Sequence, residues 1–178
     1  MKTSNKEDLI KSSALKLFSQ KGYLVTTVES IAKEAGISKG SVYSYFSTKE
    51  EILEAVLKTG FESIFSNFVE EINNEDEFEH FINDVIIKII ENRDFYRLYY
   101  ALISQSEILK EVLKYFQPHI DSYLKLIEAY YNAKGYDNPM AKALLLGASI
   151  DGIGMAYILM GDEYPIEIVK KELIENNI

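Results

Sequence analysis

Residues 26–49 encode two short helices that meet at a tight turn, in the sequence TTVESIAKEAGISKGSVYSYFSTK. Gly36 stands at the turn, where the backbone needs a conformation that a Cβ atom would penalise. Ala32 is the small residue that lets the two helices approach each other. The inward contacts at this spacing are assigned to Ile31, Ala35, Ile37, Val42 and Tyr45. The pattern is typical of a helix-turn-helix, and the competing interpretation is a helical hairpin that forms only a solvated corner.

The outer surface of this motif is suited to a DNA groove. Thr26 and Glu29 have the spacing of a capping box for the first helix, and Ser38 is placed to cap the second. Ser41 and Ser44 are expected to influence base preference. The residues predicted to contact double-stranded DNA are Thr26, Thr27, Ser38, Lys39, Gly40, Ser41, Tyr43, Ser44, Tyr45 and Lys49.

The charge of the chain is divided unevenly along its length. The net charge is −9, which by itself opposes binding to phosphate. Residues 1–50 hold eight Lys against five acids, a net charge of +3, whereas residues 51–178 carry a net charge of −12. Lys39, Tyr43 and Lys49 are expected to meet phosphates. The basic amino-terminal part is therefore expected to face DNA and the acidic remainder to point away from it.

About a third of the chain resembles the amino-terminal domain of the TetR family of bacterial transcriptional regulators. The residues that carry the resemblance are Ala14, Leu17, Phe18, Lys21, Gly22, Tyr23, Thr26, Thr27, Val28, Ile31, Ala32, Ala35, Gly36, Ser38, Lys39, Gly40, Ser41, Val42, Tyr43, Tyr45, Phe46, Lys49 and Glu50. The resemblance implies a homodimer whose paired recognition helices enter successive major grooves of an operator. It also implies a carboxy-terminal domain that binds a small-molecule effector. Ser44 departs from the larger residue of many members, which leaves the base preference open.

Helical periodicity extends along almost the whole chain, so the predicted fold class is all-α. Residues 1–47 are predicted to form a three-helix helix-turn-helix DNA-binding domain, and residues 48–178 a helical ligand-binding and dimerisation domain. One long helix is expected to run from about Thr48 to Ile72. A short helix is expected to start at Ser106, and Pro118 to lie in the first turn of the helix after it.

The stretch Ala143–Met160 is apolar enough to suggest a membrane span. Asp151 at its centre argues against insertion, because an acidic residue there costs about 2.5–3.5 kcal/mol on insertion scales. A buried helix of a protein with no membrane partner is favoured. Its glycines are candidates for close helix packing, either within the chain or between the last helices of two subunits. The residues assigned to the dimer interface are Gly147, Gly154 and Ile158.

The chain has 13 tyrosines and no tryptophan, and many of the tyrosines lie in the central helices. Tyrosine rings suit a small-molecule pocket, although they suit the margin of a core equally well. The residues proposed to line a pocket are Phe61, Phe65, Tyr96, Tyr99, Tyr123 and Asp151. An apolar or aromatic effector bound there is expected to tilt the long helix and change the separation of the recognition helices.

Signals for an enzyme are weak. Glu77 and His80 have metal-ligand spacing, but the second Glu-x-x-His pair of a di-metal bundle is missing. The sequence contains neither a phosphate-binding loop nor a nucleophile elbow, and we expect no catalytic residue, metal or cofactor. The alternative to a DNA-binding regulator is an all-helical small-molecule binder or enzyme with a structural helical hairpin. No cysteine and no secretory leader are seen, so a cytoplasmic location is expected.

Overall fold

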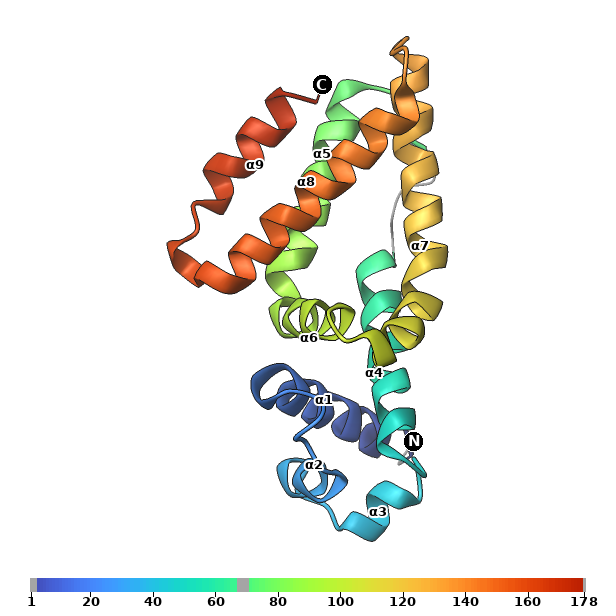
Figure 1. The fold of residues 1–178 in the computed structure, drawn as a ribbon, viewed down its shortest axis with the longest axis vertical. Helices are drawn as coiled ribbons and strands as arrows, with labels where there is room; N and C mark the ends of the chain where they lie inside the picture. The colour runs from blue at the N-terminus through green and yellow to red at the C-terminus, as the bar shows by residue number, and fades with distance from the viewer. Residues whose placement is uncertain (1–2, 67–70, 178) are drawn as a thin grey trace. The chain divides into compact units, whose positions relative to one another are not determined.

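The structure, a computed structural model, describes residues 3–66 and 71–177. Every regular element in these residues is a helix, which confirms the predicted all-α class. The elements in chain order (Figure 1) are α1 (Thr3–Lys21), α2 (Val28–Glu34), α3 (Lys39–Tyr43), α4 (Lys49–Phe65), α5 (Glu75–Glu91), α6 (Arg93–Ile103), α7 (Ser106–Ala133), α8 (Pro139–Met160), the 3₁₀ turn η1 (Gly161–Glu163) and α9 (Ile166–Glu175).

Helix α4 is shorter than predicted. It ends at Phe65, and Ile72, where the predicted helix ended, lies in non-helical chain. Residues 67–70 of that prediction lie outside the described residues. The start of α5 explains the non-helical backbone before it, because the Asn74 side chain accepts a hydrogen bond from the Glu77 N–H at 2.9 Å. An N-cap residue of this kind needs non-helical backbone, so α4 cannot continue into α5.

Helix α7 is one continuous element of 28 residues, where the sequence predicted two helices. Pro118 lies inside it rather than in a first turn. Proline has no N–H and therefore removes one hydrogen bond from the helix. Tyr123, Ile127 and Tyr131 are buried further along α7, and burial of these large side chains offsets the loss.

The residues group into two compact units. The first consists of Met1–Ser63 with Arg97–Tyr115, and the second of Ile64–Tyr96 with Phe116–Ile178. This division brings part of the central helices together with the amino-terminal helices. The domain boundary predicted after residue 47 stays a prediction.

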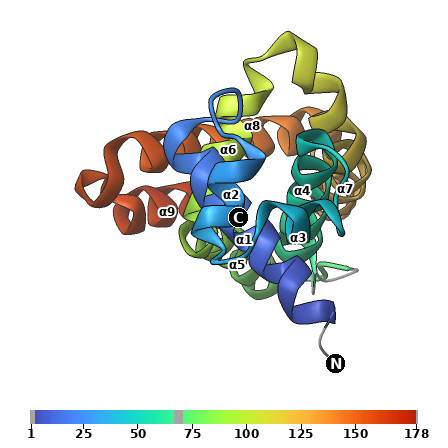
Figure 2. The ribbon, with the colours of Figure 1, turned by 90° about the horizontal axis from the view of Figure 1, so that it is seen from below.

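Helices α1, α2 and α3 lie side by side in the first unit (Figure 1 and Figure 2). Their buried apolar side chains are Ile10, Ala14, Leu17, Phe18, Ile31, Ala32 and Val42, and the buried Phe46 follows α3. An ion pair between Lys16 Nζ and Glu34 Oε1, at 2.5 Å, joins α1 to the last turn of α2. The hydrogen bond from Lys16 lowers the pKa of the Glu34 carboxyl.

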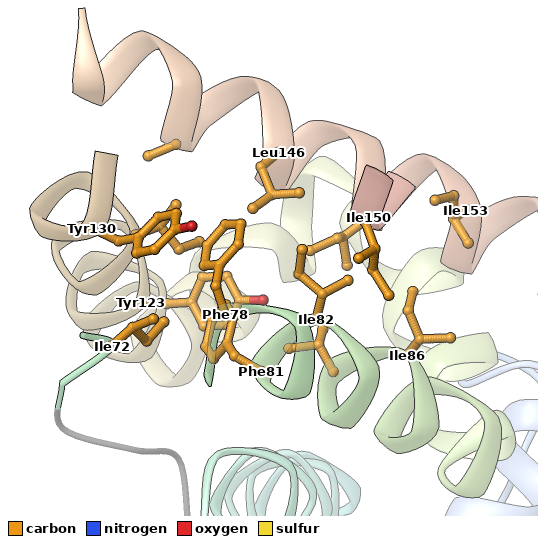
Figure 3. Packing of buried hydrophobic residues seen from close by; sticks show 14 of the residues in the cluster. Ile72, Phe78, Phe81, Ile82, Ile86, Tyr123, Tyr130, Leu146, Ile150 and Ile153 are labelled. Carbon is orange, nitrogen blue, oxygen red and sulfur yellow. The ribbon is translucent and has the colours of Figure 1, made fainter. Parts of the chain in front are cut away.

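The second unit has an aromatic and aliphatic core between α5, α7 and α8 (Figure 3). The rings of Phe78 and Tyr130 stack with centroids 4.0 Å apart. Ile82 and Ile86 of α5 lie beneath Ile150 of α8 in Figure 3. Helix α9 packs against both α5 and α8. This core packs against one side of α8 and leaves the other side of the helix exposed.

Candidate nucleic-acid interface

Gly36 makes the turn between α2 and α3. Its φ is +66°, and an added Cβ would meet nothing within 4 Å, so backbone conformation rather than crowding selects glycine here. The Ile37 N–H donates to the Ala32 carbonyl at 3.0 Å and closes the turn. Of the predicted inward contacts, Ile31, Ala35 and Val42 are buried, and Ile37 and Tyr45 are half-buried. The helix-turn-helix prediction is confirmed.

One of the two predicted helix caps lies one residue away from its predicted position. Ser38 caps α3 as expected, because its Oγ accepts a hydrogen bond from the Ser41 N–H at 3.1 Å. Helix α2 is capped by Thr27 rather than Thr26. Thr27 Oγ1 accepts from the Ser30 N–H, and Ser30 Oγ accepts from the Thr27 N–H, each at 3.1 Å. This reciprocal pair replaces the predicted one.

Thr26 is buried, and its side chain is 3% exposed. Its Oγ1 donates to the carbonyl of Gly22 at 2.8 Å and also lies 3.4 Å from the carbonyl of Leu17. The predicted DNA contact by this side chain is therefore corrected, because the hydroxyl faces its own chain. Thr26 instead shapes the loop that leads into α2.

The exposed face of the motif keeps most of the predicted contact residues. Those that are exposed are Thr27, Ser38, Lys39, Gly40, Tyr43 and Ser44, while Ser41 and Tyr45 are half-buried. Lys39 supplies a cation, and Tyr43, 48% exposed, supplies a phenol. The remaining positions of α3 on this face are small. The surface thus has two long side chains that are able to reach phosphates. Between them the small residues leave the backbone open to close approach by a duplex.

The serine hydroxyls of α3 are engaged within the helix. Ser41 Oγ lies 2.9 Å from Ser38 Oγ, and Ser44 Oγ donates to the Ser41 carbonyl at 2.7 Å. The oxygens of Ser41 and Ser44 each keep a lone pair for a donor on a base edge. The predicted influence of Ser41 and Ser44 on base preference stays a prediction.

Lys49 is not available to a phosphate in this geometry. Its Nζ donates to the carbonyls of Tyr23, Leu24 and Thr26 at 3.0, 3.2 and 3.1 Å. An ammonium has three N–H donors, so these three bonds use all of them. In the structure Lys49 contacts the loop between α1 and α2, and its predicted phosphate contact stays a prediction. A lysine in a sequence carries no sign that three carbonyls will converge on it.

Two of the residues predicted to line a pocket meet in the first unit. The rings of Phe61 on α4 and Tyr99 on α6 are 5.9 Å apart in an edge-to-face arrangement. Both side chains are buried, with 2% and 5% exposed. A shift of α4 relative to α6 would change the contact between these two rings.

The other predicted pocket residues belong to the second unit. Burial raises the pKa of the Tyr123 hydroxyl, and Tyr96 and Asp151 lie near enough to raise it further. Asp151 keeps an exposed side chain, yet surrounding protein displaces enough water to raise the pKa of its carboxyl. Phe65 stacks on the ring of His119 with centroids 4.6 Å apart.

A surface groove of about 550 Å³ also lies in the second unit, along α7 and the segment that precedes α5. Its lining residues are Glu71, Ile72, Asn73, Ser122, Lys125, Leu126, Ala129 and Ala133. None of the predicted pocket residues is among them. The groove and the aromatic residues are therefore two separate features of this unit.

The residues assigned to a dimer interface lie on the side of α8 that faces its own chain. A Cβ added to Gly147 would touch Leu124 Cδ2 of α7 at 3.8 Å. Gly154 is buried, and the half-buried Ile158 packs against the core. Packing within the chain occupies this side of the helix, and the assignment of these residues to a dimer interface stays a prediction.

The opposite side of α8, which we call the outer face, is apolar and exposed. It consists of Ala141, Leu144, Leu145, Ala148, Gly152, Met155 and Leu159. Leu145 is 66% exposed and Leu159 79% exposed. Among the described residues, Pro139–Glu163 is the one helical stretch long and apolar enough to cross a membrane by length and composition alone. A helix of this composition suits burial against another protein surface equally well.

Comparison with known proteins assigns the family. Residues 10–56 match the family model described as bacterial regulatory proteins, tetR family. The chain is 31% identical over 133 residues to IcaR of Staphylococcus epidermidis, the biofilm operon icaADBC HTH-type negative transcriptional regulator. That match covers 70% of this chain and 69% of IcaR. A second relative, the HTH-type transcriptional regulator YuxN of Bacillus subtilis, is 48% identical over 64 residues, which are 36% of this chain but only 22% of YuxN.

A solved structure shows the same fold over nearly the whole chain. The fatty acid degradation regulator FadR from Bacillus halodurans matches with a TM-score of 0.80 at 17% identity, covering 98% of this chain and 95% of that one. These relatives are transcriptional regulators rather than enzymes. The chain belongs to the TetR family of bacterial transcriptional regulators, and its amino-terminal helices form the DNA-binding helix-turn-helix of that family.

Proposed function

We propose that this protein is a ligand-responsive repressor that binds a double-stranded operator as a homodimer and is released by a small molecule. The observation that carries the proposal is the exposed face of α3, where Lys39, Gly40 and Tyr43 stand on a helix held by the Gly36 turn and the Ser38 cap. Each α3 would enter one major groove, with half-sites about 34–36 Å apart. IcaR, a relative of this chain, is a negative transcriptional regulator. Operator DNA lies in the bacterial cytoplasm, where we place the protein.

Gly40 is a residue that the fold does not require. Its backbone is helical, and an added Cβ would meet only Ser38 Oγ, at 4.0 Å. Glycine inside a helix costs about 1 kcal/mol relative to alanine, and α3 has only five residues in which to offset this. The space beside Gly40 faces outward. We infer that a duplex occupies it when α3 lies in the groove.

The Gly40→Ala variant tests this role. Its free energy of unfolding should stay unchanged or rise by up to about 1 kcal/mol, because alanine is the better helix former. Its operator affinity should fall by about tenfold, because a methyl group would hold the backbone away from the duplex. Urea unfolding and titration of a labelled operator measure the two quantities. Gln20→Ala, an exposed change on α1, is the control, and operator affinity equal to the parent in Gly40→Ala would place the duplex elsewhere.

The outer face of α8 supports the homodimer. A contiguous apolar stripe along a helix is unusual on a monomer and marks an interaction surface. Its exposed residues recur every three or four positions, the spacing with which two helices pack. Ile168 of α9, 67% exposed, adds a further apolar side chain next to this helix in the chain. A two-fold symmetric pair of subunits would cover the face on both copies at once.

The aromatic residues support an apolar or aromatic effector. Tyr99 packs edge-on against Phe61, so a ligand that displaces Tyr99 would also displace a residue of α4. The Tyr99→Leu variant keeps most of the buried volume and is expected to bind the operator like the parent. It should need a higher concentration of effector for release, measured by titrating hydrophobic compounds into the operator complex. Release at the parent's effector concentration would place the ligand away from Tyr99.

A further inference from the structure

The ammonium of Lys49 lies among three backbone carbonyls of one short loop. Tyr23, Leu24 and Thr26 supply the oxygens, at 3.0, 3.2 and 3.1 Å from Nζ. The ring of Tyr23 adds a cation–π contact, with its centroid 4.3 Å from Nζ. Lys49 is the first residue of α4, and the loop leads directly into α2. One side chain therefore joins the beginning of α4 to the entrance of the helix-turn-helix.

The next residue of α4 holds the same loop. The Tyr23 hydroxyl donates to Glu50 Oε1 at 3.1 Å, and the ring of Tyr23 packs edge-on against Phe18 with centroids 5.2 Å apart. Burial raises the pKa of Tyr23, so the hydroxyl keeps its proton and remains a donor at neutral pH. The pKa of the Glu50 carboxyl is lowered, mainly by a hydrogen bond from its own backbone N–H and to a smaller extent by the hydrogen bond from Tyr23. The carboxylate therefore remains an acceptor.

We propose that Lys49 is a positioning residue for operator binding, whose ammonium fixes the loop between α1 and α2 to the first turn of α4. The proposal rests on the proposed function, because the helices that it positions are those that would meet DNA. Since α2 packs against α3, holding the loop also holds the recognition helix in a set orientation to α4. In this role Lys49 acts through the loop and does not touch the duplex.

The site requires three N–H donors that point from one atom toward three carbonyl oxygens. Three acceptors surround one point, and an ammonium directs three N–H groups from a single atom. A guanidinium carries the same charge, but its donors lie in one plane as a fork. Lys49→Arg thus separates the two possible roles, because arginine retains a phosphate contact and does not reproduce the three carbonyl bonds.

Operator affinity and amide hydrogen exchange of the DNA-free dimer measure the effect. Lys49→Arg should bind operator about tenfold more weakly, although its charge is kept, as expected for loss of a charge-assisted hydrogen-bonded contact. The N–H of Thr26, which donates to the Tyr23 carbonyl at 3.3 Å, should exchange faster with solvent. Lys58→Arg, an exposed change on the same helix, is the matched control and should alter neither quantity.

Chemical rescue provides a readout that a general loss of stability would not give. Lys49→Ala should bind operator weakly, and methylammonium should restore part of the affinity by occupying the carbonyl site. Tetramethylammonium at the same ionic strength has no N–H donor and should not restore it. Equal ionic strength is needed because salt itself weakens binding to DNA.

The outcomes separate this proposal from the proposed function. Parent-like operator affinity of Lys49→Arg would overturn the positioning role and return Lys49 to a direct phosphate contact. Unchanged exchange at Thr26 in Lys49→Arg would overturn it as well, whether or not the parent protein binds an operator. Failure of the parent to bind any duplex would contradict the proposed function alone, because the exchange experiment contains no DNA.

Discussion

Replacing Leu145 and Leu159 together by glutamate should convert the dimer to monomers and lower operator affinity by about 10²- to 10⁴-fold. Both side chains lie on the outer face of α8 and are among the most exposed apolar residues, at 66% and 79%. In a two-fold interface each glutamate would be buried twice, without a partner. A monomer then binds one half-site and loses the gain in effective concentration that a second linked half-site provides. Ultracentrifugation and operator titration measure the two effects.

The matched control is Ile87→Glu, which places the same charge on an exposed apolar position of α5, 42% exposed. This variant should remain dimeric and bind operator like the parent. Circular dichroism should show helical content equal to the parent in both proteins, because neither change removes a core residue. A Leu145→Glu/Leu159→Glu protein that stays dimeric would move the interface away from the outer face of α8.

Replacing Lys39 and Tyr43 together by alanine should lower operator affinity by about 10²-fold or more, because each change occurs in both subunits and removes contacts to a charged backbone. Loss of the Lys39 cation should also flatten the dependence of log affinity on log salt by roughly 0.9 for each phosphate, or about 1.8 for the dimer. Tyr43 is uncharged and should lower affinity without altering that slope. Binding isotherms at several salt concentrations separate the two contributions.

Lys58→Ala removes the same charge from an exposed position of α4 and is the control for net charge. Its effect on affinity should be small and should vary little between duplexes. Retention of both the parent's affinity and its salt dependence by the Lys39→Ala/Tyr43→Ala protein would exclude α3 as the contact surface. The double variant should fold like the parent, because both replaced side chains are exposed.

The helix-turn-helix was predictable because its signals are local. Gly36 has a positive φ, a conformation that few other residues adopt, and Ser38 caps the helix that follows. The cap of α2 was placed one residue too early, because Thr26 and Thr27 are both good caps with a polar residue three positions on. Which of them turns inward depends on where α1 ends, and the sequence does not fix that to one residue.

The outer face of α8 could not be predicted from periodicity. The helix is apolar on almost every side, so the pattern of Gly147, Gly152 and Gly154 does not show which side meets the rest of the chain. Tertiary packing makes that choice by placing α5 and α7 against one side. The contacts of Lys49 could not be predicted for a related reason, because its partners are backbone carbonyls 23 to 26 residues away.

The most direct test of DNA binding by α3 is selection of duplexes from a random-sequence pool by the parent protein. The same selection is then run with the Lys39→Ala/Tyr43→Ala variant. We expect the parent to enrich a two-fold symmetric sequence whose half-sites are separated by about 34–36 Å or a multiple of it, with one dimer bound per site. The variant should enrich nothing above the starting pool. Enrichment of no sequence by the parent, or of the same sequence with equal affinity by the variant, would contradict operator recognition by this helix.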